Sequence, residues 1–164
     1  MMGRSQMLAT TLLGAWVAVT ACMWLAATGS FATLNRVLSR PSPGLSEASR
    51  PLGQEQSRLV LRHLASEINR TYFGAYGWAQ MALGALLFFL LARQTPRDAV
   101  ALGMVGAMLG VVLVLAFVIT PQIVTLGRAL DFVPRDPPPP ELARFGRLHG
   151  LYTLLDGAKL LAGL

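Results

Sequence analysis

The stretch AVALGMVGAMLGVVLVLAFVIT, residues Ala99 to Thr120, decides the fold because it contains no charged side chain. The uncharged run begins directly after Asp98 and continues beyond Thr120 as far as Arg128. The hydrocarbon core of a bilayer is about 30 Å thick, and a helix that rises about 1.5 Å per residue crosses it in about 20 apolar residues. This run therefore predicts a transmembrane helix.

Two further uncharged runs precede it, between Arg4 and Arg36 and between Arg70 and Arg93. Of the 164 residues, 54% are hydrophobic and only 13% are charged, and the charges gather between the runs. This distribution is typical of a protein that crosses a membrane several times. We predict one all-α domain, an integral membrane bundle of four transmembrane helices, with spans near residues 7–32, 71–92, 99–120 and 143–163.

The fourth predicted span ends in HGLYTLLDGAKLLAGL, where Asp156 and Lys159 interrupt an apolar helix. A charge inside a bilayer costs about 2.5 kcal/mol or more unless it faces protein, water or another charge. The two residues are three apart, so we expect an ion pair near the membrane boundary, where the long stem of Lys159 reaches water. A proton or cation site at Asp156 is the alternative.

Histidine and cysteine offer little for metal binding. His149 is expected at the other boundary of the fourth span, and no other histidine lies in a predicted span. A haem would need a second axial ligand, so neither haem nor copper is expected. His63 lies one turn from Glu67, which favours an ion pair or hydrogen bond, and no further metal ligand follows nearby in the sequence. The single cysteine, Cys22, has no partner for a disulfide.

The connection between the first and second spans has two parts. Pro41, Pro43 and Pro51 predict a loop over residues 40–53. Apolar residues at steps of three and four then predict an amphipathic helix that runs into the second span: Leu61, Leu64, Ala65, Ile68 and Tyr72. We expect this helix at the level of acidic lipid headgroups, with a docking surface for a partner or ligand as the alternative.

Small residues predict where the helices pack. The third span has three glycines on one face, Gly103, Gly106 and Gly110. Such residues let transmembrane helices approach closely, because no hydrophobic force drives their association in lipid. The expected partners on the second span are Gly77, Ala82 and Gly84. Homodimerisation through this face is the alternative. At the end of the third span, Pro121 is expected to end or kink the helix.

Aromatic residues cluster at the start of the second span: Tyr72, Phe73, Tyr76 and Trp78. Amphipathic rings favour the boundary between lipid and water, so the cluster predicts the depth of the helix in the membrane. A cofactor site is the alternative interpretation.

The arginines predict an orientation in the membrane. Most lie in the two long connections, at positions 36, 40, 50, 58, 62, 70, 128, 135, 144 and 147, against Arg4, Arg93 and Arg97 on the other side. Basic residues favour the cytoplasmic side, so we expect both long connections in the cytoplasm of a bacterial inner membrane. Acidic lipid explains the net charge of +6, and nucleic acid is not an expected partner. The first apolar run exceeds the roughly 7–15 residues of a signal peptide core, which favours a retained helix.

Four segments together resemble one family. They are TGSFATLNRVLSRP, EINRTYFGAYGWAQ, ITPQIVTLGRALDF and FGRLHGLYTLLDGAKLLAGL. Their arrangement is similar to that of the transmembrane protein 205-like proteins, a family whose function is largely uncharacterised, and its most specific motif maps onto Phe145, His149 and Gly150. The resemblance implies a four-helix membrane bundle. It extends remotely to families that handle copper or porphyrins through intramembrane histidines, which the first span lacks.

Two classes of function fit the sequence. The first is a non-enzymatic binding, assembly or accessory component of a membrane complex, alone or as a homo-oligomer. The second is a membrane carrier or redox protein that handles a metal ion, a proton or a porphyrin through His149 and Asp156, with Glu67 or Arg70 as further polar residues. The sequence shows no nucleophile with a base, no cluster of Cys and His ligands and no glycine-rich phosphate loop. We therefore predict no catalytic residue and favour the first class.

Overall fold

The computed structural model describes residues 3–133 and 137–164, which form helices and turns without a strand. In chain order the elements are α1 (Arg4–Ser39), α2 (Pro43–Ser49), α3 (Gly53–Ala92), α4 (Ala99–Val114), η1 (Leu115–Ile119, a π-helical turn), α5 (Thr120–Leu130) and α6 (Pro140–Ala162). The predicted all-α class is confirmed for these residues.

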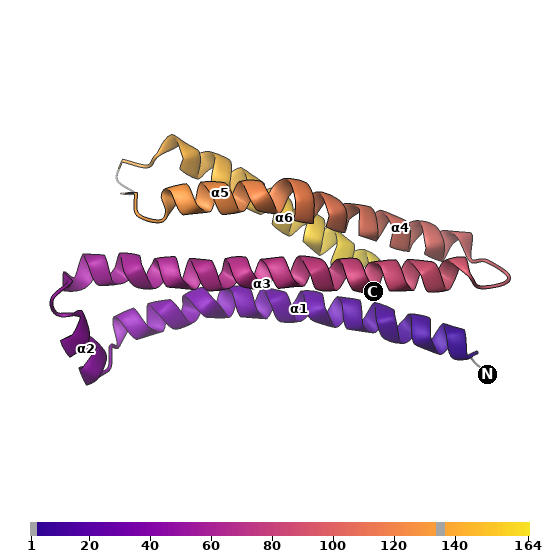
Figure 1. Ribbon diagram of the computed structural model, residues 1–164, viewed down its shortest axis with the longest axis horizontal. Helices are drawn as coiled ribbons and strands as arrows, with labels where there is room; N and C mark the ends of the chain where they lie inside the picture. Colours follow the sequence, from indigo (N-terminus) through magenta and orange to yellow (C-terminus); the bar gives the residue numbers. More distant parts are fainter. Residues whose placement is uncertain (1–2, 134–136) are drawn as a thin grey trace.

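The helices form two layers (Figure 1). Antiparallel α1 and α3 pack along each other in one layer. In the other layer, α4, η1 and α5 follow one another as a single long rod, and α6 packs against this rod. The connection from α1 to α3 and the connection from α5 to α6 lie at the same end of the molecule, opposite the N-terminus and the short turn between α3 and α4 (Figure 1).

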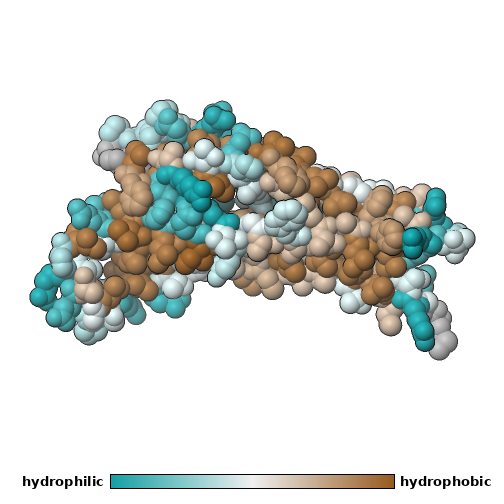
Figure 2. All heavy atoms as spheres, viewed as in Figure 1, coloured by the Kyte–Doolittle hydropathy of each residue, from teal (hydrophilic) through white to brown (hydrophobic). Residues whose placement is uncertain are grey.

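Three stretches of helix are long and apolar enough to cross a membrane: Arg4–Ser39, Gly53–Ala92 and Ala99–Leu130. They contain the first three predicted spans. The face shown in Figure 2 is largely hydrophobic, with hydrophilic side chains gathered toward the two ends and between α3 and α5. Within the described chain, α6 does not meet the same measure, because Arg147, Asp156 and Lys159 fall within its apolar part.

The last turn of α6 lies within the bundle rather than at its end. A Cβ added at Gly163 would lie 3.1 Å from the side chain of Val17 and 3.3 Å from that of Met108. Val17 is about three and a half turns into α1, and Met108 is about two and a half turns into α4. Asp156 and Lys159, near this end of α6, are therefore placed deep between the other helices.

The predicted loop over residues 40–53 is wrong in part, because it contains the short helix α2. Pro43 occupies the first turn of this helix, where a missing N–H costs nothing and the fixed φ angle suits the helix. Ser42 caps it, and its side-chain oxygen accepts a hydrogen bond from the amide of Leu45 at 3.3 Å. Proline here starts a helix rather than excluding one.

Pro121 does not end the helix of the third span, because α5 continues through this residue to Leu130. Proline has no N–H to donate to the carbonyl four residues earlier, and its ring crowds that carbonyl. The π-helical turn η1 lies directly before it and spans Leu115–Ile119. A wider turn of this kind accommodates a locally disrupted hydrogen-bond ladder, so the rod passes through the proline.

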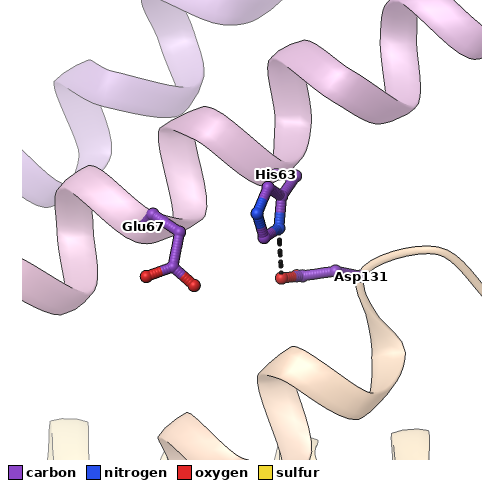
Figure 3. Close-up of side chains that lie close together, drawn as sticks. All are labelled: His63, Glu67 and Asp131. Carbon is purple, nitrogen blue, oxygen red and sulfur yellow. Dashed lines mark hydrogen bonds and ion pairs between the residues drawn. The ribbon is translucent and has the colours of Figure 1, made fainter.

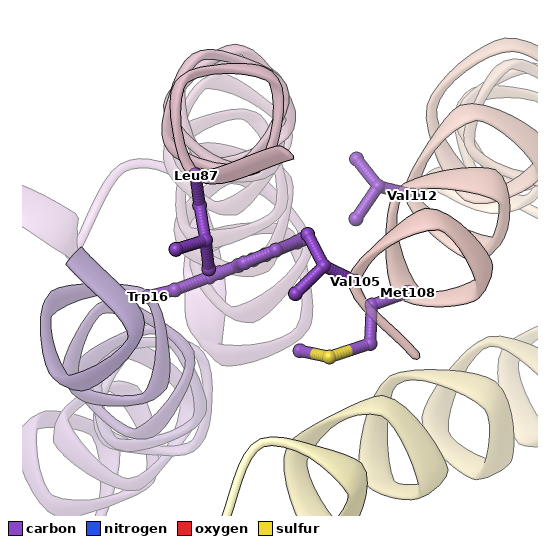
Figure 4. Close-up of a cluster of buried hydrophobic side chains, with 5 residues drawn as sticks. All are labelled: Trp16, Leu87, Val105, Met108 and Val112. Carbon is purple, nitrogen blue, oxygen red and sulfur yellow. The ribbon is translucent and has the colours of Figure 1, made fainter. Parts of the chain in front are cut away.

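A hydrophobic core joins the two layers near the turn between α3 and α4. It consists of Trp16, Leu87, Val105, Met108 and Val112, drawn from α1, α3 and α4 (Figure 4). The indole of Trp16 is 1% exposed and lies at its centre. Its Nε1 donates a hydrogen bond to the Oε1 of Gln80 at 3.1 Å, so the ring is fixed as well as buried.

Of the five glycines predicted at helix contacts, Gly77, Gly84 and Gly106 lie at such contacts, whereas Gly103 and Gly110 do not. A Cβ at Gly84 would lie 2.7 Å from the indole of Trp16, so this side chain of α1 packs directly on the backbone of α3. At Gly77 the nearest atom is the Cβ of Ala116 at 3.7 Å, and at Gly106 it is the ring of Phe88 at 3.3 Å. No described atom lies within 4 Å of a Cβ placed at Gly103 or Gly110. The predicted close contact of these last two is therefore not found, because large side chains decide which face of α4 turns inward.

We predict that Gly84→Ala destabilises the protein by about 1–3 kcal/mol, because the added methyl group displaces an indole that is packed and hydrogen-bonded. The matched control is Gly110→Ala, which should be neutral or stabilise by about 0.5–1 kcal/mol through reduced backbone entropy. Denaturant unfolding in one detergent measures both. Equal stability of the two variants would contradict this packing.

Candidate functional site

The carboxylate of Asp156 is the centre of a buried polar network between α1, α3 and α6. Asp156 is 0% exposed, and the Nζ of Lys159 lies 2.7 Å from its Oδ1. The hydroxyl of Tyr76 donates to the same oxygen at 2.9 Å, and the indole Nε1 of Trp24 donates to Oδ2 at 2.8 Å. Lys159 also donates to the hydroxyl of Tyr76 at 3.1 Å.

Both charges of this network are compensated, which is what burial requires. Each oxygen of Asp156 accepts at least one hydrogen bond, and the ammonium of Lys159 pairs with the carboxylate and with Tyr76. The predicted ion pair between the two residues is therefore present. Its predicted place near water is wrong, because the side chain of Lys159 is only 1% exposed. Helix α6 carries the pair inward instead of presenting it at a boundary.

Sequence reasoning missed the two aromatic members of this network. Tyr76 was expected to mark the membrane boundary, but it is 4% exposed and its hydroxyl points to Asp156. Trp24 attracted no prediction. A signal existed, since Trp16, Thr20 and Trp24 recur every four residues within the apolar α1. Side chains with polar atoms at helical spacing in such a run predict an inward face.

A second polar cluster joins α3 to the end of α5, and three of its members appear in Figure 3. The guanidinium of Arg70 donates to both oxygens of Asp131, at 2.9 and 3.0 Å, and also to Glu67. Arg128 donates to both oxygens of Glu67, at 3.1 and 3.2 Å. The Nδ1 of His63 lies 2.7 Å from Asp131. The predicted pairing of His63 with Glu67 is thus not found. His63 contacts Asp131, directly after α5, and Glu67 accepts from Arg128 of α5.

This cluster also has the composition of a metal site. One atom from each of His63, Glu67 and Asp131 lies within 4.8 Å of the others. The guanidinium of Arg70, however, already contacts both carboxylates. A divalent cation would have to displace it and would meet its repulsion. Ion pairs among Glu67, Arg70, Arg128 and Asp131 therefore link α3 to the end of α5, and we call this cluster the clamp.

A cavity of about 550 Å³ lies between the two polar groups, at the junction of α1, α3, α5 and α6. Phe31, Phe73, Ile123 and Val124 give it a largely apolar wall. Its polar lining includes Asn35, Ser66, Asn69, Arg70 and His149. A wall of this kind, apolar with a few polar groups, is typical of sites for small molecules.

Asn69 is the least satisfied polar residue of the cavity wall. It is 6% exposed, its Nδ2 donates to the carbonyl of Ala27 at 3.4 Å, and its Oδ1 has no hydrogen-bond partner. Because a carbonyl only accepts, the amide group must turn its nitrogen to Ala27 and leave the oxygen unpaired. A buried acceptor without a partner costs about 1–3 kcal/mol. A residue of the cavity wall therefore holds a hydrogen-bond acceptor without a partner.

The structure places His149 and Asp156 in different environments. His149 is exposed, and its ring stacks on that of Phe145 with centroids 5.9 Å apart, both lining the cavity. Seven residues separate His149 from Asp156, about 10 Å along the helix. Among the recorded contacts of the described residues, nothing joins them directly. The two predicted functional residues thus do not form one site, whereas Arg70 lines the cavity and belongs to the clamp.

We predict that Asp156→Asn and Lys159→Met each destabilise the protein by about 3–5 kcal/mol, because each leaves a buried charge without its partner. The double variant should lose less than the sum, with a coupling energy of about 1–3 kcal/mol. Unfolding of the three variants in one detergent measures the cycle. Strictly additive losses would show that the two charges do not interact.

No family model, curated protein or solved structure matches this chain. The resemblance to the transmembrane protein 205-like family therefore stays a prediction. The function proposed below therefore rests on the geometry of the described residues.

Proposed function

We propose that this protein is a non-enzymatic membrane protein that binds a small, largely apolar molecule in the cavity between α1, α3, α5 and α6. The observation that carries the proposal is the cavity itself. Its volume of about 550 Å³ lies within the roughly 300–1,000 Å³ of typical ligand sites, and four helices contribute to its wall. Binding of this kind fits an accessory component of a larger membrane assembly.

The membrane placement that we propose includes α6 as a fourth, membrane-embedded helix. The charges of Asp156 and Lys159 do not oppose this placement, because they neutralise each other inside the bundle. The arginines of the long connections favour the cytoplasmic side of a bacterial inner membrane, where acidic headgroups lie. In this orientation the clamp of Arg70 and Asp131 lies toward the cytoplasm.

The geometry gives less support to a carrier or redox role. Asp156 already accepts from Trp24, Tyr76 and Lys159, so an arriving proton or cation would have to break a satisfied network. His149 lies about two turns away, against Phe145. The cavity needs no such rearrangement to accept a ligand.

We predict that a small neutral phenyl diazirine labels the cavity saturably in protein held in lipid nanodiscs. Peptide mass spectrometry should find it at Phe73 and Ile123, whereas labelling of the lipid-facing Leu86, 53% exposed, should rise linearly with probe concentration. Ala27→Phe fills the cavity and should reduce the saturable labelling several-fold. The matched control, Leu25→Phe, changes a residue on the same helix that is 72% exposed and should have no effect.

Two results would contradict the proposed function. One is labelling of Phe73 and Ile123 that rises linearly at every probe concentration. The other is saturable labelling that Ala27→Phe leaves unchanged, which would place the probe outside the cavity.

A further inference from the structure

We propose that the ligand of this cavity carries a hydroxyl group, an alcohol or a phenol, which lodges between Asn69 and Arg70 while its hydrocarbon body fills the apolar part. The inference rests on the proposed function and adds the chemical class of the ligand. Three properties of the residues around the cavity lead to it: an unused acceptor, unused donors on the next residue of α3, and a balance of charge.

The unused acceptor is the Oδ1 of Asn69. This atom is buried, has no partner and belongs to a residue that lines the cavity. Turning the oxygen toward the cavity gives up the 3.4 Å hydrogen bond from Nδ2 to Ala27, but the terminal torsion of asparagine has a broad energy well that permits this rotation. A ligand that brings a donor would remove the penalty of the unpaired oxygen.

The unused donors belong to Arg70, the next residue on α3. A guanidinium has five N–H groups, and its recorded bonds to Glu67 and Asp131 use both groups of Nη1 and one of Nη2. Nη2 and Nε lie 3.1 and 3.8 Å from the position of a Cβ at Gly127, which also lines the cavity. Arg70 therefore has N–H groups beside the space that Gly127 leaves open.

The charges around Arg70 already balance. Glu67 and Asp131 carry two negative charges, and Arg70 and Arg128 carry two positive ones. His63, which also contacts Asp131, adds a positive charge only when it is protonated. A ligand carboxylate or ammonium would add an uncompensated charge next to an apolar wall, which is costly in a low dielectric. A neutral polar group avoids this cost, so the cavity selects against ionic ligands.

A hydroxyl is the smallest neutral group that matches both sides. It donates one hydrogen bond, to Asn69, and accepts others, from Arg70. An ether or ester oxygen accepts only and leaves Asn69 unpaired. The apolar part of the wall, including Phe31, Phe73 and Ile123, offers no hydrogen bond from its side chains and suits hydrocarbon.

The test uses the phenyl diazirine as reporter and four competitors that share one dodecyl chain. They are 1-dodecanol, its methyl ether, dodecanoate and dodecylammonium, each titrated over the same range of mole fraction in the nanodisc bilayer. We expect 1-dodecanol to displace the saturable labelling at a concentration about tenfold lower than the methyl ether, the effect of one hydrogen bond to a buried group. Both ionic competitors should be weaker than the alcohol.

The variants assign this preference to one side chain. Asn69→Leu removes the acceptor at similar size, so the tenfold advantage of the alcohol over the ether should fall to about one. Asn35→Leu makes the same chemical change elsewhere in the cavity wall and should keep the advantage. The competitor series in the unaltered protein stands independently, should Asn69→Leu fail to fold.

The outcomes separate the two proposals. Absence of saturable labelling in the unaltered protein would overturn the proposed function. Saturable labelling that alcohol and ether displace equally would keep the binding function and overturn the inference about the hydroxyl. Strongest displacement by dodecanoate would show an anion site at Arg70, and an undiminished alcohol preference in Asn69→Leu would exclude Asn69 as the acceptor. The last two results also overturn the inference.

Discussion

The pairing of Asp156 with Lys159 constrains the rest of this structure, because two charges so deeply buried must find their partners inside the protein. They find them across the layers, where Trp24 of α1 and Tyr76 of α3 bond the carboxylate that α6 carries. The hydrophobic core around Trp16 joins the same two layers through α4. Polar bonds therefore hold α6 where apolar packing alone would leave its orientation free.

The cavity lies between two groups of polar interactions that join the helices. Asp156 fixes the layers on one side of it, and the bidentate pair of Arg70 with Asp131 fixes α3 to the end of α5 on the other side. Between them the wall is built from aromatic and branched side chains that leave about 550 Å³ unfilled. Protein interiors are usually densely packed, so an unfilled space of this size between two groups of polar interactions is consistent with a ligand site. The unpaired oxygen of Asn69, on the cavity wall, is consistent with the same interpretation.

The sequence predicted what depends on neighbouring residues along the chain. Uncharged runs predicted three apolar helices, and a spacing of three predicted the pair of Asp156 and Lys159. What failed depends on contacts between distant helices. Tyr76 faces inward because its hydroxyl bonds the carboxylate of Asp156 on α6. Glu67 does not pair with His63 because it bonds Arg128 of α5 instead. The cavity could not be foreseen from any single segment, since four helices contribute to it.

The central claim is that Asp156 receives hydrogen bonds from α1 and from its own helix at once. Magic-angle-spinning NMR of protein in lipid bilayers, with ¹⁵N in Trp and Lys and ¹³C in the Asp carboxyl groups, tests it directly. We expect short-range transfer from the indole of Trp24 and the ammonium of Lys159 to one carboxyl carbon, with both signals lost in Asp156→Asn. A Lys159 ammonium that exchanges freely with water and shows no transfer to a carboxyl carbon would contradict the claim.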